Sequence, residues 1–321
     1  MMEIINNRRQ PFATETYAKA MIRLTEESCQ KIYGYFPNPA IHVNNKAIKA
    51  SSLITNYCDM LLMLYTAGYA IENLTSNLEP LIAAYERKRE FDILAYGSDE
   101  VCAGFGENDD YEQFLQTLSL CILLGRGELI PRLSAIFDRD NKGQDAIYET
   151  LLSFYDDSRI RTDDLLFKRP YAGLLKVIRA STPEEASKLL DKYCKDWYPA
   201  FKKAPWYDSH LSIDGDDGSY SGYWAFEAGA IAFLFNIDDS QIDHMVYPKD
   251  MVAYTRNFIP PAGSTQIGRV EAGQPCPRAG YWFTPAQANS RRHFQQGELM
   301  PSFTVSSWGD TLWYWSGEES A

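Results

Sequence analysis

The segment Asp214-Gly-Asp-Asp-Gly-Ser219 carries carboxylates at spacings that could coordinate a calcium ion. A calcium loop of the EF-hand type needs an oxygen ligand at its fifth position and a bidentate Glu at its twelfth. Counted from Asp214, those positions hold Gly218 and Ala225, which offer no side-chain oxygen. The sequence therefore predicts no metal site here, with a loose cation site as the minor alternative.

Two acidic pairs, Asp156-Asp157 and Asp163-Asp164, are of the kind that hydrolyse glycosidic bonds. That reaction needs two carboxyl groups about 5–10 Å apart, which a sequence does not reveal. A helical carbohydrate-active enzyme is therefore the alternative function. The four histidines match no zinc spacing, and neither a phosphate loop nor a Gly-x-Ser-x-Gly motif occurs. We expect a protein that is not an enzyme and that uses no cofactor or metal.

The stretch 219–235 is the segment around which we expect the fold to form. Between Tyr220 and Phe235 only Glu227 is charged, and small residues alternate with large ones. Apolar side chains on every face at helical spacing are typical of a helix surrounded by other helices. We predict a buried central helix in which Glu227 is a hydrogen-bonded structural carboxylate. Pro248 then begins another helix, which runs to about Phe258.

The remaining chain predicts a mainly α fold, a multi-helix bundle with a small β-rich C-terminal appendage. Thr182-Pro-Glu-Glu185 is a capping box with Pro in the first helical turn, and Thr14 or Thr16 could cap the first helix. The predicted helices span 12–35, 41–70, 74–91 with a kink near Pro80, 111–124, 128–137, 144–155, 174–179 and 182–201.

The composition changes after Pro260-Pro261, where Gly, Pro, Trp and Tyr become frequent. The segments 280–284 and 311–315 are rich in strand-favouring aromatic residues and are bounded by turn residues. We therefore predict three parts. Residues 1–125 form an N-terminal helical part, 126–262 a central helical part of the same bundle, and 263–321 a β-rich C-terminal module.

The charge of the chain is strongly negative, with a net charge of −12 and a pI of about 4.9. Two windows, 90–125 and 204–248, contain acidic residues but no Lys or Arg. Such a balance disfavours nucleic acid and anionic membranes and favours a cationic protein partner. Acidic groups in connecting loops would speed the encounter with that partner, and salt would weaken the attraction.

Several features of the sequence indicate a cytoplasmic protein. Glu3 and the pair Arg8-Arg9 follow Met1 without an apolar run, so no secretory signal is expected. The most apolar window, 60–71, is too short to span a bilayer. Six cysteines are scattered without a C-x-x-C pair, which predicts reduced core thiols.

The segments 222–232, 237–240 and 247–252 resemble the signature of a bacterial immunity-protein family. That family protects cells against PoNe-type nuclease toxins delivered by type VI secretion and related systems. The segments 272–282, 292–301 and 311–315 are similar to a C-terminal module of type VI secretion immunity proteins. The resemblance implies a cytoplasmic, non-enzymatic protein that binds one cognate toxin. Of the recurring residues, Trp224, Glu227, Tyr247 and Pro248 are interpreted as architectural.

The leading hypothesis is an immunity protein whose acidic loops bind and neutralise a basic nuclease toxin. Inhibition by occlusion of the active site and inhibition by an allosteric route both stay open, and so does a homodimer. We expect Tyr207 and Tyr220 to be aromatic anchors of the contact. The acidic candidates for toxin binding are Asp99, Glu107, Asp109, Asp110, Asp214, Asp216, Asp217, Asp238 and Asp239.

Overall fold

A computed structural model describes residues 8–97, 104–258, 269–284, 286–287, 290–303 and 311–317 of the chain. The described residues are mainly α-helical and include a small four-stranded antiparallel sheet, which confirms the predicted fold class. The chain divides into two compact units. Unit 1 comprises Met1–Thr117, Arg132–Asp140 and Tyr198–Trp224, and unit 2 comprises Leu118–Pro131, Asn141–Trp197 and Ala225–Ala321. The three-part division by sequence stays a prediction.

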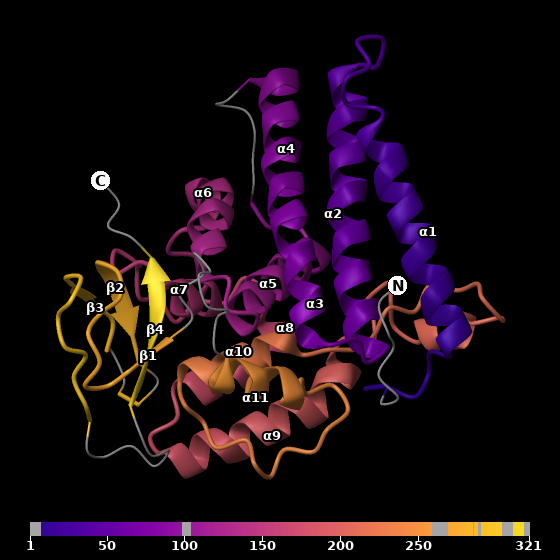
Figure 1. The fold of residues 1–321 in the computed structure, drawn as a ribbon. Helices are drawn as coiled ribbons and strands as arrows, with labels where there is room; N and C mark the ends of the chain where they lie inside the picture. Colours follow the sequence, from indigo (N-terminus) through magenta and orange to yellow (C-terminus); the bar gives the residue numbers. More distant parts are fainter. Residues whose placement is uncertain are drawn as a thin grey trace. The chain divides into compact units, whose positions relative to one another are not determined.

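Three long helices of unit 1 lie side by side, with α2 (Val43–Thr66) between α1 (Glu15–Tyr33) and α4 (Leu78–Tyr96) (Figure 1). The Thr14 hydroxyl caps α1 as predicted, because it accepts a hydrogen bond from the Tyr17 amide at 3.1 Å. Pro80 lies in the first turn of α4, where its missing N–H costs no hydrogen bond. The sequence predicted an interruption of this helix near Pro80. In the structure the interruption lies just before Pro80, ahead of the first residue of α4.

Most of the remaining helical elements agree with the predicted segments to within a few residues, but α8 (Lys168–Ile178) begins six residues before its predicted start at residue 174, and the short helix η3 (Ser209–Ser212) was not predicted. The cap of α9 (Pro183–Ala200) is the predicted one, because the Glu185 amide donates to the Thr182 hydroxyl at 3.2 Å. The Glu185 carboxylate in turn accepts from the Ser181 amide at 2.8 Å. These elements are α3 (Ile71–Leu74), η1 (Thr75–Asn77), α5 (Asn108–Leu123), η2 (Gly127–Leu129), α6 (Ile130–Asn141), α7 (Ala146–Leu152), α8 (Lys168–Ile178), α9 (Pro183–Ala200), η3 (Ser209–Ser212), α10 (Phe226–Leu234) and α11 (Lys249–Asn257).

The predicted central helix is shorter than the apolar stretch that suggested it. Helix α10 begins only at Phe226, whereas residues 219–225 are not helical. Gly222 has a φ of +138°, which ends any helix there. The next residue, Tyr223, donates its amide to the Gln10 Oε1 atom at 3.0 Å. This backbone is thus held by a side chain from the far N-terminus, a contact that local periodicity does not encode.

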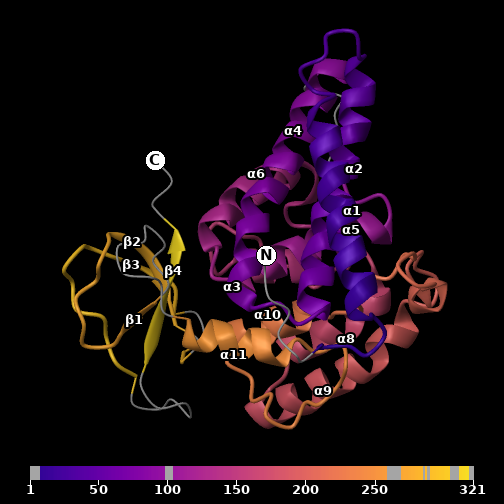
Figure 2. The same ribbon diagram turned by 45° about the vertical axis from the view of Figure 1, so that its right-hand side comes forward.

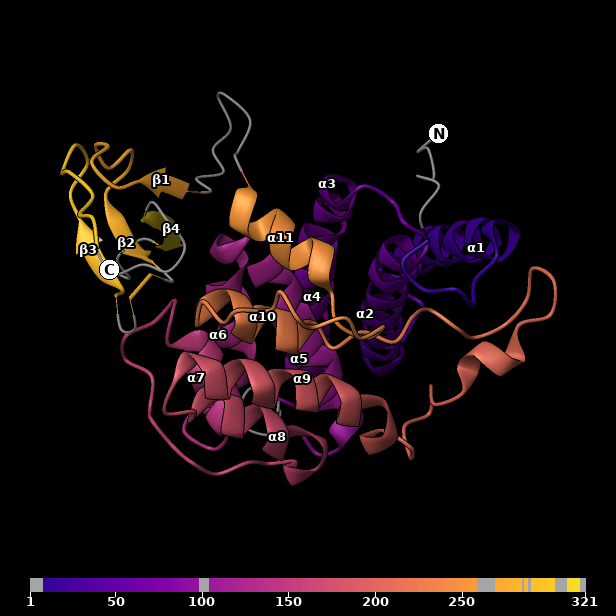
Figure 3. The same cartoon turned by 90° about the horizontal axis from the view of Figure 1, so that it is seen from below.

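Within unit 2, α10 lies between α9 and α11 (Figure 3). Gly229 allows the close approach of α11. A Cβ atom at this position would lie 2.7 Å from the Pro248 Cγ atom and 3.0 Å from a Val252 methyl group. The small residues of α10 therefore serve close helix packing, as the sequence indicated.

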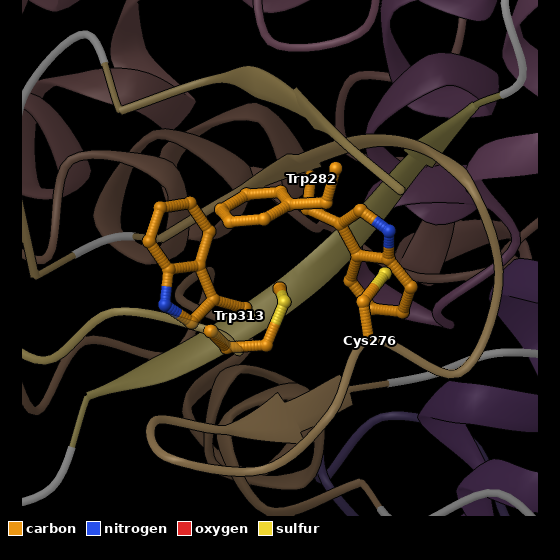
Figure 4. Packing of buried hydrophobic residues seen from close by; sticks show 5 residues of the cluster. Cys276, Trp282 and Trp313 are labelled. Carbon is orange, nitrogen blue, oxygen red and sulfur yellow. The ribbon is translucent and has the colours of Figure 1, made fainter. Parts of the chain in front are cut away.

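The C-terminal sheet has the strand order β1-β4-β2-β3, and its strands are seen from another side in Figure 2. Its core holds Cys276, Trp282 and Trp313 (Figure 4), together with Phe294 and Met300. Both indole N–H groups are satisfied, because Trp313 donates to the Pro301 carbonyl at 2.8 Å and Trp282 to the Arg278 carbonyl at 3.2 Å. The strands are β1 (Arg269–Glu271), β2 (Gly280–Phe283), β3 (Arg292–Phe294) and β4 (Leu312–Gly317).

We predict that Gly222→Ala destabilises the protein by about 2 kcal/mol or more. The new Cβ atom would lie 2.1 Å from the Thr66 Oγ1 atom, and the φ of +138° is unfavourable for alanine. Gly106→Ala is the control, because Gly106 has open space around its Cβ position. That control should change the free energy of unfolding by less than about 0.5 kcal/mol. Urea unfolding followed by circular dichroism measures both, and equal midpoints would refute the packing argument.

Candidate functional site

The residues Asp214, Asp216 and Asp217 project from a tight hairpin turn in unit 1. The Asp214 amide donates to the Asp217 carbonyl at 2.9 Å, and the Asp217 amide donates back to the Asp214 carbonyl at 3.1 Å. Gly215 has the positive φ, +63°, that this two-residue turn requires. All three aspartates are exposed. The turn therefore presents three carboxylates close together on one loop tip, and it does not have the geometry of a calcium loop.

A second acidic group lies at the start of α5, also in unit 1. Glu107, Asp109 and Asp110 are exposed. The pKa of Asp109 is raised, first by partial burial and then by the neighbouring charges of Asp110 and Glu107. Carboxylates near a helix N-terminus also interact favourably with the helix dipole. The fourth candidate of this window, Asp99, lies outside the described residues.

Two side-chain hydrogen bonds within unit 1 hold the segment that carries the hairpin, Tyr198–Trp224, to α5 and α2. The indole of Trp206 donates to the Glu112 carboxylate of α5 at 3.1 Å. The Ser221 hydroxyl donates to the Asp59 carboxylate of α2 at 3.0 Å. Asp59 keeps exposed surface, yet surrounding protein raises its pKa by desolvation. Asp59 was not predicted as a site residue, although it is a lone charge in the apolar run of α2.

These carboxylates are not neutralised by basic side chains. Among the described residues none of them forms an ion pair, whereas other acids of unit 1 do. Arg132, for example, pairs with Glu79 at 2.6 Å and with Glu86 at 2.7 Å. We call the uncompensated set the unit 1 carboxylates. They are Asp59, Glu107, Asp109, Asp110, Asp214, Asp216 and Asp217.

The two tyrosines predicted as anchors differ in accessibility. The prediction that Tyr220 anchors a partner was wrong, since its side chain is 0% exposed and its hydroxyl donates to the Gln10 side chain. Its ring is buried in the core and cannot contact a partner in this structure. Tyr207 is partly exposed and stacks on Tyr198 with ring centroids 4.5 Å apart. Only Tyr207 therefore remains a candidate anchor.

The neighbouring residues Asp238 and Asp239, in unit 2, also differ in accessibility. The prediction that Asp239 contacts the toxin at the surface was wrong, because Asp239 is only 5% exposed. Its carboxylate pairs with Arg256 at 2.6 Å and accepts a hydrogen bond from the Tyr247 hydroxyl at 2.6 Å. Asp238 is exposed, and its carboxylate accepts from the Ser240 amide at 2.9 Å. That bond lowers the pKa of Asp238. Asp239 therefore stabilises the turn that displays Asp238.

The residues interpreted as architectural are all buried. Glu227 accepts hydrogen bonds from the Tyr193 hydroxyl at 2.8 Å and from the Trp197 indole at 2.7 Å, both on α9. Trp224 donates its indole N–H to the Thr66 hydroxyl at 2.8 Å, and Pro248 packs close to Gly229. Each of these residues satisfies a buried polar group or fills a helix contact.

Family models match the chain over two long ranges. "PoNe immunity protein (PoNi), N-terminal" matches residues 6–135, and "PoNe immunity proteins (PoNi), C-terminal" matches residues 143–251. The chain belongs to the PoNe immunity protein family. This is a family of nuclease-immunity proteins, as the resemblance implied.

A solved structure shares the fold of this PoNe immunity family member. It is described as the crystal structure of protein PA2201 from Pseudomonas aeruginosa, and it is 21% identical to this chain with a TM-score of 0.63. The similarity covers 78% of this chain and 91% of that one. No curated protein matches the sequence.

Membership of the family does not favour the alternative of a carbohydrate-active enzyme. The Asp163 carboxylate, one of its proposed catalytic groups, forms an ion pair with Arg179. In the part of the chain that the structure describes, no group of three or more His, Cys, Asp or Glu side chains could hold a metal ion. No described helix combines the length and apolar character needed to cross a membrane.

We predict that Glu227 makes stability fall as the pH rises. Burial raises the pKa of Glu227 from 4.5 to about 7, against the opposing effect of its hydrogen bonds. The folded state therefore binds this proton more tightly than the unfolded state. The contribution is complete below pH 4.5 and is lost as the pH passes 7. The total effect is on the order of 3 kcal/mol.

Glu227→Gln tests this linkage, because its carbonyl oxygen can still accept both hydrogen bonds but does not titrate. Urea unfolding of both proteins from pH 4.5 to pH 8 should show a stability difference that grows with pH in favour of the Gln variant. Glu26→Gln, at an exposed position on α1, is the control and should follow the wild type. Parallel pH profiles for wild type and Glu227→Gln would contradict the assignment.

Proposed function

We propose that the chain neutralises a cognate PoNe-type nuclease toxin by forming a stoichiometric complex with it, and that the unit 1 carboxylates make the contact. Membership of the immunity family is the observation that carries the proposal. The protein then acts by binding alone, in the cytoplasm of a cell that exchanges toxins by type VI secretion or a related system. Its partner is a basic nuclease, as the acidity of the chain suggests.

The unit 1 carboxylates support an electrostatic mode of recognition. A nuclease binds phosphates through Lys and Arg side chains, and exposed carboxylates offer those side chains an alternative partner. The hairpin at Asp214–Asp217 is suited to this role, because the turn orders the backbone that carries three exposed carboxylates, and none of them forms an ion pair with a described residue. Tyr207, stacked and partly exposed beside the exposed Asp208, would add a rigid aromatic contact. Asp238 is a further exposed contact candidate in unit 2.

Co-expression with the product of a neighbouring toxin gene tests the function itself. Bacteria that produce the toxin should die with an empty plasmid and survive with this chain. The purified proteins should elute as one complex, and light scattering of that complex and of the free chain gives the stoichiometry. Failure to restore growth, despite soluble expression of the chain, would refute the proposal.

Charge reversal tests the contact separately. We predict that replacing Asp214, Asp216 and Asp217 together by Lys weakens toxin binding at least tenfold, or about 1.4 kcal/mol. The wild-type affinity should fall with rising salt, and the variant should show a shallower salt dependence.

The matched control replaces Glu26, Glu72 and Glu90 by Lys, three exposed residues on α1, α3 and α4. It changes the net charge by the same amount and should alter the affinity less than threefold at moderate salt, because long-range attraction is screened. Surface plasmon resonance across a salt series measures both variants. Equal losses in the two variants would show that only net charge matters and would refute a contact by the hairpin.

A further inference from the structure

A cavity of about 340 Å³ in unit 2 is lined by four arginines, although the chain as a whole is acidic. Arg159 and Arg161 come from the connection between α7 and α8, Arg179 from the end of α8, and Arg291 from the residue before β3. Cavities of this volume are typical of sites for small-molecule ligands. A guanidinium group is costly to bury unless an anion or hydrogen-bond acceptor compensates it.

The only carboxylate among the lining residues, Glu149, compensates just one of the four arginines. It accepts from the Arg159 Nε atom at 2.9 Å and the Arg159 Nη2 atom at 2.8 Å. It also accepts from the backbone amides of Gly143 at 2.7 Å and Ile160 at 3.0 Å. Both oxygens of Glu149 are thus occupied. Arg159 and Glu149 are a structural pair, and the other three arginines remain for a ligand.

Two of those arginines have donors that no described group accepts. Arg291 donates to the Tyr155 carbonyl at 2.8 Å and to the Ser316 hydroxyl at 2.7 Å, but its buried Nη1 atom has no hydrogen bond to any described residue. Arg179 is bonded to Asp163 and to the Thr162 carbonyl, whereas its buried Nε atom has no hydrogen-bond partner in the described chain.

Nearby acids reduce this positive charge without removing it. The Asp157 carboxylate lies 3.6 Å from the Arg291 Nη1 atom, beyond hydrogen-bonding distance, and its side chain is 70% exposed. Asp163 is 81% exposed. Neither residue lines the cavity. Water therefore screens both acids, while the Arg291 side chain is only 10% exposed.

Arg161 is the arginine best placed to meet a ligand. It is exposed, and no ion pair or hydrogen bond of its side chain occurs in the described part of the chain. A second cavity, of about 630 Å³, shares Arg161 and Arg179 with the first and is also lined by Lys168 and Lys176. Asp163 and Asp164 line it too. The basic groups thus extend from one cavity into the other.

The remaining wall of the first cavity is mixed, because the hydroxyl residues Thr150, Ser153, Thr162 and Ser290 line it beside apolar and aromatic side chains. Phe154 and Phe235 line it, with ring centroids 5.4 Å apart at an angle of 72°. Leu234 and Ile178 add aliphatic surface. Arginine binds planar and tetrahedral oxyanions through paired N–H groups. We propose that this cavity binds a small organic oxyanion, in which a phosphate or carboxylate group is attached to an apolar, aromatic-sized body.

Isothermal titration calorimetry of the full chain tests the site with phenyl phosphate, benzoate, inorganic phosphate and phenol. Phenyl phosphate or benzoate should bind at one site, and the tighter of the two identifies the head group. Inorganic phosphate and phenol should each bind at least tenfold more weakly, because each lacks one of the two required parts. Binding of phenol as tight as that of phenyl phosphate would overturn the role of the arginines.

Arg161→Gln should weaken the tighter probe at least tenfold, and it is expected to fold because Arg161 is exposed and makes no structural bond within the described chain. Lys188→Gln removes one positive charge from an exposed position of α9 in the same unit and should change the affinity less than twofold. The proposal is overturned if neither phenyl phosphate nor benzoate binds, or if the Arg161 and Lys188 variants bind the tighter probe equally well.

Discussion

The buried carboxylate of Glu227 is the interaction on which the packing of unit 2 depends. It is the one charged group of α10, and both of its side-chain hydrogen-bond donors lie on α9. An unbonded carboxyl group in this environment would be strongly destabilising, so α10 is stable only where Tyr193 and Trp197 reach it. The carboxylate thus specifies which face of α9 meets α10. The raised pKa of Glu227 shows that its bonds only partly offset the cost of burial.

Hydrogen bonds from other parts of the fold also hold the loops that carry exposed carboxylates. In unit 2, Arg256 holds Asp239 and donates to the Ile237 carbonyl at 2.9 Å, and the Ser187 hydroxyl donates to the Asp238 carbonyl at 2.6 Å. In unit 1, the Tyr17 hydroxyl both donates to and accepts from the backbone of Tyr220 at 2.9 Å. The turn at Asp238 and the segment that follows the hairpin at Asp214–Asp217 are therefore both held by side chains from other parts of the fold. A loop ordered in advance loses less conformational entropy when a partner binds.

Local signals in the sequence were sufficient for most of the fold. The Thr14 and Thr182 caps, the Pro in first turns and the strand composition of 280–284 and 311–315 are properties of a few neighbouring residues. The start of α10 was predicted too early because Gln10 and Thr66, which hold residues 219–224 in an extended path, are remote in the chain. The apolar periodicity within residues 219–235 gives no information about those two remote partners.

The candidate site shows the same limit more sharply. Asp238 and Asp239 are adjacent and chemically identical, yet one is exposed and the other is buried against Arg256. Tyr207 and Tyr220 differ in the same way, because only Tyr220 meets the Gln10 side chain. Sequence reasoning could identify the acidic windows, since charge is a property of composition. It could not assign individual residues to surface or core, because that depends on partners elsewhere in the fold.

Net charge is an equally incomplete guide to binding. A value of −12 describes the chain seen from far away, but a ligand meets the charges within about 10 Å of it. At the hairpin of unit 1 those charges are three carboxylates without a counter-ion, and the local field is more negative than the average suggests. The charged residues that line the cavity of unit 2 are four arginines and Glu149, and the acids that pair with Arg179 and Arg291 are exposed to water. Because water screens an exposed charge more than a buried one, Arg291, whose side chain is only 10% exposed, keeps a positive local charge in that cavity even though acids outnumber bases in the chain as a whole.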